Sequence, residues 1–316
     1  MSENIYNIGS HKVGIYGEKL VNAVGKLHGF APFAQTNGND IQDGMVEQEA
    51  FSFHYAGEEY SGSRPEEVGE LLYTSENDGV ASEFYSLDEG RRYLQRMRRS
   101  GKSFKPATPW AEELYLIIDK TESKGFFYGA LVPQMLRFAL WIGYGAMTTD
   151  LHTLAIHSSC IIYKGRAVIF LGESGTGKST HTRLWRENIE GAFLLNDDSP
   201  VVRSRMKEVG SAGCQEVYVY GSPWSGKTPC YRQERYPLAA VVRLYQAPFN
   251  KIEKLSLLRA YSALHPSCPP DFAYSQRLYD GISATIGDIL ERVPVYMMGC
   301  LPDKDAASVS CKAIFG

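Results

Sequence analysis

Hydrophobic and polar positions along the C-terminal part of the chain predict an alternation of strands and helices. Apolar runs at residues 157–163 and 167–171, separated by Lys164 and Gly165, indicate a β-hairpin. Further strands are expected at residues 192–198, 216–221, 237–246 and 293–300. Helical spacing of apolar residues predicts helices at residues 179–189, 254–265 and 275–291, and after Pro302. Strands alternating with helices are typical of an α/β domain.

The N-terminal part of the chain is more mixed in its pattern. Two strands are expected at residues 113–120 and 125–132, followed by a helix from Pro133 to about Thr149. Elsewhere the spacing predicts a helix at residues 20–30, strands around an Ala-Gly turn at residues 49–62, a charged helix at residues 87–99, and a loop at residues 100–110. We therefore expect a smaller α+β domain over residues 1–130, of unassigned role, and an α/β domain over residues 131–316.

Composition excludes several classes of protein. The 316 residues are 44% hydrophobic and 22% charged, which is ordinary globular usage and excludes wholesale disorder. A net charge of −3 argues against a chain-wide basic field, so we expect no nucleic-acid partner. The most apolar window, residues 131–147, contains Arg137 and is too short for a clean membrane span, so we expect a buried helix and no membrane partner.

The six cysteines form no CxxC pair, and the N-terminus lacks the pattern of a secretory leader. Both observations favour scattered reduced thiols in a cytoplasmic protein.

The strongest motif is GESGTGKS at residues 172–179, which matches G-x-x-x-x-G-K-[ST] in full. An apolar strand precedes it and a helix follows, as a phosphate-binding loop requires. Glycines let the backbone N–H groups point at phosphate oxygens, Lys178 can reach the β- and γ-phosphates, and the Ser179 hydroxyl can bind Mg²⁺. The alternative is a glycine-rich turn between a strand and a helix. The nucleotide-binding candidates are Gly172, Glu173, Ser174, Gly175, Thr176, Gly177, Lys178, Ser179 and Thr180.

A second match, GSPWSGKT at residues 221–228, is not expected to bind phosphate in the same way. Pro223 has no N–H group to offer, Trp224 is bulky, and no apolar-striped helix follows. A loop near the nucleotide or the acceptor fits better, with Ser225, Gly226 and Lys227 as its candidate residues. Lys227 could supply a cation to the transferred phosphoryl group, or be an exposed loop lysine.

Paired acids end the strand at residues 192–198. Asp197 and Asp198 lie where a Walker-B type metal ligand belongs, at the carboxyl end of a strand near the glycine-rich loop. One carboxylate can hold Mg²⁺ and the other can take a proton from an acceptor hydroxyl. Consecutive strand residues point to opposite faces, which would leave only one in place to act. The alternative is a pair of acids that opens the turn before Pro200.

His157 stands at the start of the predicted hairpin. It could be catalytic, could orient one of the acids, or could be a structural strand histidine. His152 and His181 are expected to be structural or surface residues.

These motifs together resemble the catalytic core of the HPr kinase/phosphorylase family, within the phosphoenolpyruvate carboxykinase-like fold. The similarity rests on His157, GESGTGKS and the Asp197-Asp198 pair, and it extends over roughly residues 134–316. It implies that one aspartate is the base for the acceptor with His157 nearby. Asp197 is the first choice for this role, and Asp198 is then a second acid or, with Ser179, a metal ligand. The resemblance leaves open which acid takes which role. It also allows a homo-oligomer.

The departures from the family narrow the expected activity. A further family signature after the aspartates is absent and GSPWSGK stands instead, which argues against HPr as substrate and against the reverse phosphorylase reaction. The arginine and lysine pattern of carboxykinases is also absent. We therefore expect an ATP- and Mg²⁺-dependent kinase that acts on a hydroxyl of a protein serine or a small molecule. The alternative is a catalytically inactive nucleotide-binding regulatory protein.

Overall fold

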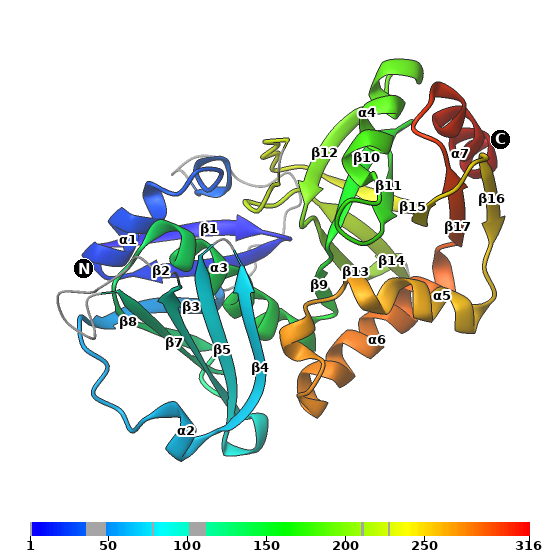
Figure 1. Ribbon diagram of the computed structural model, residues 1–316. Coiled ribbons are helices and arrows are strands. Elements are labelled where there is room, and N and C mark those ends of the chain that lie inside the picture. The colour runs from blue at the N-terminus through cyan, green and yellow to red at the C-terminus, as the bar shows by residue number, and fades with distance from the viewer. Residues whose placement is uncertain (1, 36–48, 78, 101–111, 210–211, 227) are drawn as a thin grey trace. The chain divides into compact units, whose positions relative to one another are not determined.

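The computed structural model describes residues 2–35, 49–77, 79–100, 112–209, 212–226 and 228–316 (Figure 1). It divides the chain into two compact units. The N-terminal unit comprises residues 1–151 and 270–280, and the C-terminal unit comprises residues 152–269 and 281–316. The boundary expected at residue 130 therefore falls before the helix at Pro133–Thr148, whereas the compact units separate after it.

The N-terminal unit is built on an eight-stranded sheet in the order β1-β2-β3-β8-β7-β6-β5-β4. Helices α1 and α3 contact this sheet, α1 at β2 and β3 and α3 at β6 and β7. Close approach of α3 needs two glycines, because a Cβ on Gly125 or Gly143 would lie 2.4 Å or 2.7 Å from the Phe53 ring. The elements are β1 (Glu3–Ile8), β2 (His11–Tyr16), α1 (Glu18–Gly25), β3 (Glu49–Gly57), α2 (Pro65–Val68), β4 (Glu70–Asn77), β5 (Val80–Leu87), β6 (Arg92–Arg99), β7 (Glu113–Asp119), β8 (Lys124–Gly129) and α3 (Pro133–Thr148).

Some of the expectations for this unit are confirmed and others are wrong. The pair at residues 113–120 and 125–132 is present as antiparallel β7 and β8, and the buried helix after Pro133 is α3. The expected helix at residues 20–30 ends earlier, at Gly25, and residues 49–62 contain one strand, β3, rather than two. Most of the loop expected at residues 100–110 lies outside the described residues.

The charged helix expected at residues 87–99 is instead the end of β5, a turn and strand β6. Strand β6 pairs with β5 and β7, and residues 93–95 are all buried, so both faces of the strand are covered and the apolar pattern loses its period of two. Arg96, expected on a solvated face, is 20% exposed and forms an ion pair with Glu113 at 3.0 Å.

The C-terminal unit is built on a nine-stranded sheet, in which the path β12-β10-β11-β15-β14-β13-β9 is extended by β17 and β16. Strand β17 pairs with β15, and β16 pairs with β17. The elements are β9 (Thr153–Ala155), β10 (Ser158–Tyr163), β11 (Arg166–Leu171), α4 (Lys178–Asn188), β12 (Phe193–Asp198), β13 (Val201–Val209), β14 (Ala212–Tyr220), β15 (Arg235–Gln246), β16 (Lys251–Lys254), α5 (Leu257–Leu264), α6 (Gln276–Arg292), β17 (Val295–Cys300) and α7 (Lys304–Phe315). Residues 276–280 of α6 belong to the N-terminal unit.

Most elements expected in this unit are confirmed. The hairpin is β10 and β11, which pair antiparallel through a turn in which Lys164 and Gly165 both have positive φ. The helix expected from residue 254 begins later, at Leu257, because β16 occupies the preceding residues. Strands β9, β13 and β16 were not expected, and neither were β1, β2, β4 and β5 of the other unit. The structure thus supports an α/β class for the C-terminal unit.

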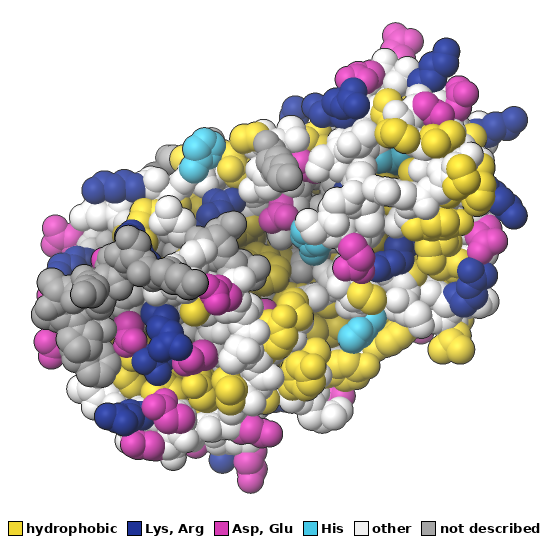
Figure 2. Space-filling view, in the orientation of Figure 1, with side chains coloured by type: hydrophobic (Ala, Val, Ile, Leu, Met, Phe, Trp, Pro, Cys, Tyr) yellow, Lys and Arg dark blue, Asp and Glu magenta, His cyan; other side chains and the backbone are white. Residues whose placement is uncertain are grey.

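Three expectations from composition can be compared with the described residues. Positive and negative side chains are interspersed on the face shown in Figure 2, without a field of one sign. In the described part of the chain, no helix is long and apolar enough to cross a membrane. The five cysteines whose environment the structure describes are free thiols.

A buried histidine belongs to the core of the C-terminal unit. His181 on α4 is 2% exposed, its Nε2 lies 3.1 Å from Ser310 Oγ on α7, and its ring packs edge-on against Phe170. Burial lowers its pKa to about 4 from the ordinary value of 6.5. His181 is therefore a neutral structural residue, as expected.

We expect acid to destabilise this core through His181. Between pH 6.5 and about 4 the unfolded chain binds a proton that the folded chain does not, so the free energy of unfolding falls as pH falls through this window. The slope from this residue should approach about 1.4 kcal/mol per pH unit. Urea unfolding from pH 7 to pH 4.5 should show a shallower slope for His181→Gln than for the wild type. Asn22→Gln, at an exposed position without a titratable group, is the control and should keep the wild-type slope. Equal slopes in wild type and His181→Gln would contradict the assignment.

Candidate functional site

The glycine-rich loop joins the end of β11 to the start of α4, as its sequence predicts. Gly177 has φ 101°, a left-handed conformation that favours glycine, and a Cβ on Gly172 would lie 2.4 Å from Thr176 Oγ1. No side chain caps α4, so its first N–H groups are open to a ligand. Uncapped N–H groups at the N-terminus of a helix, together with the helix dipole, favour an anion.

Lys178 curls back across this loop. Its Nζ donates to the backbone oxygens of Gly172 at 2.7 Å and of Glu173 at 3.3 Å. Burial lowers the pKa of this ammonium group, and nearby Asp198, Glu173 and Asp197 act in the opposite direction. The candidates Ser174 and Thr180 also lie in the loop and the first turn of α4. The loop therefore holds a half-buried cation beside its open N–H groups.

Sheet topology brings the paired acids to the same edge as the loop. Strand β10 lies between β11 and β12 and is antiparallel to both, so the carboxyl ends of β11 and β12 meet at one edge, beside the start of β10. Ser159 on β10 is opposite Phe170 on one side and Asp197 on the other.

Asp197 points inward, toward the loop. It is 5% exposed, and its Oδ1 accepts hydrogen bonds from Ser159 Oγ at 2.7 Å and from Ser179 Oγ at 3.0 Å. Oδ2 accepts from the backbone N–H of Thr228 at 3.3 Å. Asp197 is thus fixed next to the hydroxyl that the motif assigns to Mg²⁺.

Asp198 points the other way, toward His157. Its Oδ1 lies 3.3 Å from His157 Nδ1, and the two side chains are 38% and 48% exposed. His157 is held by its backbone N–H, which donates to Ser267 O at 2.8 Å. Asp198 therefore lies beside His157 and Asp197 beside Ser179, which is the reverse of the order that the resemblance put first. These contacts agree with the expectation that the two acids face opposite ways.

The segment at residues 221–228 covers the acids. The Gly226 N–H donates to Asp197 O at 2.9 Å, and Ser225 forms an isolated β-bridge with Asp198. A Cβ on Gly226 would lie 2.6 Å from Asp197 O, so a larger residue would push the segment away. No helix follows it, and the chain continues into β15. The expectation that no helix follows this segment is confirmed, and Lys227 lies outside the described residues.

Asn196 is a site residue that the sequence reasoning left without a role. It is fully buried, and its Nδ2 donates to Ser222 Oγ at 3.2 Å and to Trp224 O at 3.1 Å. Its Oδ1 accepts from the N–H groups of Asp198 and Ser199 at 3.1 Å and 3.0 Å. The Asn196 side chain therefore fixes both the turn at Asp198 and Ser199 and the segment at Ser222 and Trp224 that covers the acids. A polar amide inside an apolar strand was the available signal.

Two residues at the end of β15 were also missed. Arg243 forms an ion pair with Glu173 of the loop at 2.6 Å and donates to Ala263 O at 3.0 Å. Gln246 Nε2 donates to Gly175 O at 3.2 Å. Strand β15 is the parallel neighbour of β11, a pairing over a long sequence separation that no local pattern reveals.

The site fits Mg²⁺ bound together with phosphates. Among the described residues, no three His, Cys, Asp or Glu side chains gather into a metal site. Mg²⁺ commonly takes only one or two protein carboxylates and completes its shell with water and substrate phosphates. Ser179 Oγ and Asp197 Oδ1, 3.0 Å apart beside the loop, are oxygen donors of this kind.

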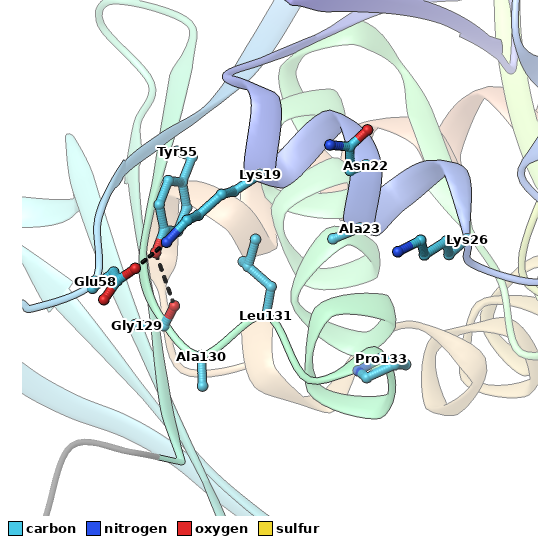
Figure 3. A pocket seen from close by; sticks show the side chains of 10 residues that line it. All are labelled: Lys19, Asn22, Ala23, Lys26, Tyr55, Glu58, Gly129, Ala130, Leu131 and Pro133. Atoms are coloured by element: carbon cyan, nitrogen blue, oxygen red, sulfur yellow. Dashed lines mark hydrogen bonds and ion pairs between the residues drawn. The ribbon is translucent and has the colours of Figure 1, made fainter.

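A separate pocket of about 580 Å³ lies in the N-terminal unit (Figure 3). It is lined by one face of α1, the end of β3 and the segment between β8 and α3. Lys19 forms an ion pair with Glu58 there, and Tyr55 donates to Gly129 O at 3.4 Å. None of the residues predicted from the sequence to act on phosphate lies in it.

No protein-family model matches this chain, and no curated protein matches it. Among solved structures it is similar to the HPr(Ser) kinase/phosphatase from Coxiella burnetii, with a TM-score of 0.25 and 11% sequence identity, over 51% of this chain and 95% of that chain. At this TM-score and identity, the similarity defines no activity for this chain.

We expect Asn196→Asp to destabilise the C-terminal unit. The substitution keeps the shape but replaces the donating amide by an oxygen that faces Trp224 O and Ser222 Oγ. Loss of buried donors should lower the free energy of unfolding by about 2 kcal/mol or more, measured by urea denaturation. Exposed Asn22 on α1 offers a matched control, and Asn22→Asp should change stability by less than about 0.5 kcal/mol. An equally small change for Asn196→Asp would show that its hydrogen bonds do not hold the turn.

Proposed function

We propose that the C-terminal unit is an ATP- and Mg²⁺-dependent kinase that transfers the γ-phosphoryl group of ATP to a hydroxyl acceptor. One observation carries the proposal: the carboxyl ends of β11 and β12 bring three groups to one edge of the sheet. These groups are the glycine-rich loop with Lys178, the Asp197–Ser179 pair and the Asp198–His157 pair. A phosphate cradle, a metal-side carboxylate and an accessible base are the parts that phosphoryl transfer requires.

In this proposal the loop and α4 hold the phosphates. The open N–H groups at the start of α4 bind phosphate oxygens, and Lys178 donates to them from within the loop. A half-buried ammonium acts in an environment with less water than the surface, which strengthens its attraction to phosphate.

Asp197 and Ser179 are the proposed Mg²⁺ ligands. Bound Mg²⁺ would neutralise negative charge on the phosphate oxygens. Asp197 is suited to this position because Ser159 and the Thr228 N–H fix the direction of its carboxylate. This assignment exchanges the roles that the resemblance put first for the two acids.

Asp198 is the proposed general base. It takes the proton of the acceptor hydroxyl as the new O–P bond forms and the bond to the ADP oxygen breaks. His157, 3.3 Å away, is a positioning residue that holds the carboxylate toward the acceptor side. Both side chains are partly exposed, so a hydroxyl on a small molecule or on a protein serine can reach them.

The alternative of an inactive nucleotide-binding regulator has less support. Lys178, Ser179 and both acids are present, and their contacts are those of an assembled site. Free thiols among the described cysteines fit a reducing compartment, and a cytoplasmic location is part of the proposal.

Transfer from ATP tests the kinase assignment. We expect wild-type protein to transfer label from γ-labelled ATP to an acceptor in a cell extract, and Asp198→Asn to reduce the rate at least about 100-fold, the range for loss of a general base. ATP binding by Asp198→Asn, measured by calorimetry, should stay near that of wild type. Exposed Asp305 on α7 supplies the control, since Asp305→Asn should keep full activity. No acceptor-dependent transfer by wild type, or full activity of Asp198→Asn, would overturn the proposal.

Magnesium dependence separates the roles of the two acids. In the same assay, Asp197→Asn should raise the Mg²⁺ concentration needed for half-maximal rate by about tenfold or more, because a ligand is weakened. Asp198→Asn should lower the residual rate without changing that concentration. The reverse result would return the metal side to Asp198 and the base to Asp197.

A further inference from the structure

The acids define one side of the glycine-rich loop, and the other side is formed by β15 and β17. The acids are on β12, reached from β11 across β10, whereas β15 pairs with the opposite edge of β11. If the γ-phosphate end of a nucleotide faces the acids, its nucleoside end extends over the carboxyl ends of β15 and β17. Both strands run parallel to the strand of the loop, so their carboxyl ends lie at the ligand-binding edge.

Direct contacts join this side to the loop. Leu171, the last residue of β11, is the register partner of Arg243 on β15. Three residues later, Gln246 donates to Gly175 O in the middle of the loop. The turn that follows β15 therefore begins in contact with the phosphate cradle.

Hydrogen bonds fix this turn. The Ala247 N–H donates to Cys300 O at 3.3 Å. Asn250 Nδ2 donates to Asp303 Oδ1 at 2.9 Å, and Asn250 Oδ1 accepts from the Leu301 N–H at 2.8 Å. The turns after β15 and β17 are thus held together in one arrangement.

Two large apolar side chains are exposed on these turns. Phe249 is 47% exposed and Leu301 is 38% exposed, although the backbone around them is well bonded. Chain length alone keeps the Cα of Phe249 within about 11 Å of that of Gln246. Tyr245 is also exposed, but its ring lies over Gly299, where a Cβ would be 2.7 Å away, and strand alternation turns it to the face opposite Gln246.

We infer that Phe249, together with Leu301 on the adjoining turn, forms the subsite for the purine base of the nucleotide. A base presents a flat apolar face, and stacking on an aromatic ring is a common way for proteins to hold it. The inference rests on the proposed function, because it assumes that nucleotide phosphates occupy the glycine-rich loop. It assigns a role to an aromatic residue outside the loop motif.

Binding of ATP and of inorganic tripolyphosphate, which has no base, tests the subsite. Both affinities are measured by calorimetry with Mg²⁺ for the full chain. Phe249→Ala should weaken ATP binding about fivefold or more, as expected for loss of one stacked base, and leave tripolyphosphate binding within twofold. Phe249→Trp should keep ATP affinity. Leu258→Ala, at a 79% exposed position on α5, is the matched control and should change neither affinity.

The other possible results contradict either the base subsite, the phosphate site or the kinase assignment. Unchanged ATP affinity in Phe249→Ala, or equal weakening of ATP and tripolyphosphate, would overturn the base subsite. Absence of ATP binding by wild type, or full binding by Lys178→Ala, would overturn the phosphate site and the subsite with it. Intact ATP binding without phosphoryl transfer would overturn the kinase assignment and leave the subsite standing.

Discussion

The antiparallel strand β10, inserted between β11 and β12, is the constraint on which the site depends. It sets the glycine-rich loop and the acids two strand spacings apart, about 9.5 Å, on strands that run in the same direction. Across that spacing, side chains from the two elements meet at one edge of the sheet, where Ser179 is hydrogen-bonded to Asp197. Ser159, on the inserted strand itself, bonds Asp197 and keeps its carboxylate directed at Ser179. The same strand begins just after His157, which lies beside Asp198. Strand β10 therefore sets the spacing between the loop and the acids, orients Asp197 and places His157 next to Asp198.

Features encoded locally could be predicted from the sequence. The strand before GESGTGKS, the helix after it and the β10–β11 hairpin follow from apolar periodicity and glycine positions, and all are present. Alternation along β12 predicted that its two acids face opposite ways. Which acid faces the loop depends on the register between β10 and β12, which shifts by a residue between Cys160 and Ile161. A shift of one residue exchanges the two faces of a strand, so the sequence could not settle the roles.

Features that depend on pairing between strands far apart in the chain could not be predicted from the sequence. Arg243 and Gln246 contact the loop only because β15 lies beside β11, 70 or more residues further along the chain. Strand β6 was mistaken for a helix because cover on both faces removed the alternation that marks a half-buried strand. Asn196 was visible as a polar residue in an apolar strand, but three of its five hydrogen-bonding contacts are with Ser222 and Trp224, in a segment that only the fold brings near.

The position of Lys178 has a consequence for what an anion meets in the loop. Its ammonium group donates to two carbonyl oxygens of the loop, those of Gly172 and Glu173. The Glu173 oxygen also accepts from the N–H and hydroxyl groups of Thr176, whereas Lys178 is the side chain that bonds the Gly172 oxygen. The lysine thus offsets the negative end of a backbone dipole in the loop as well as supplying an attractive charge. A neutral side chain in its place would remove both effects at once.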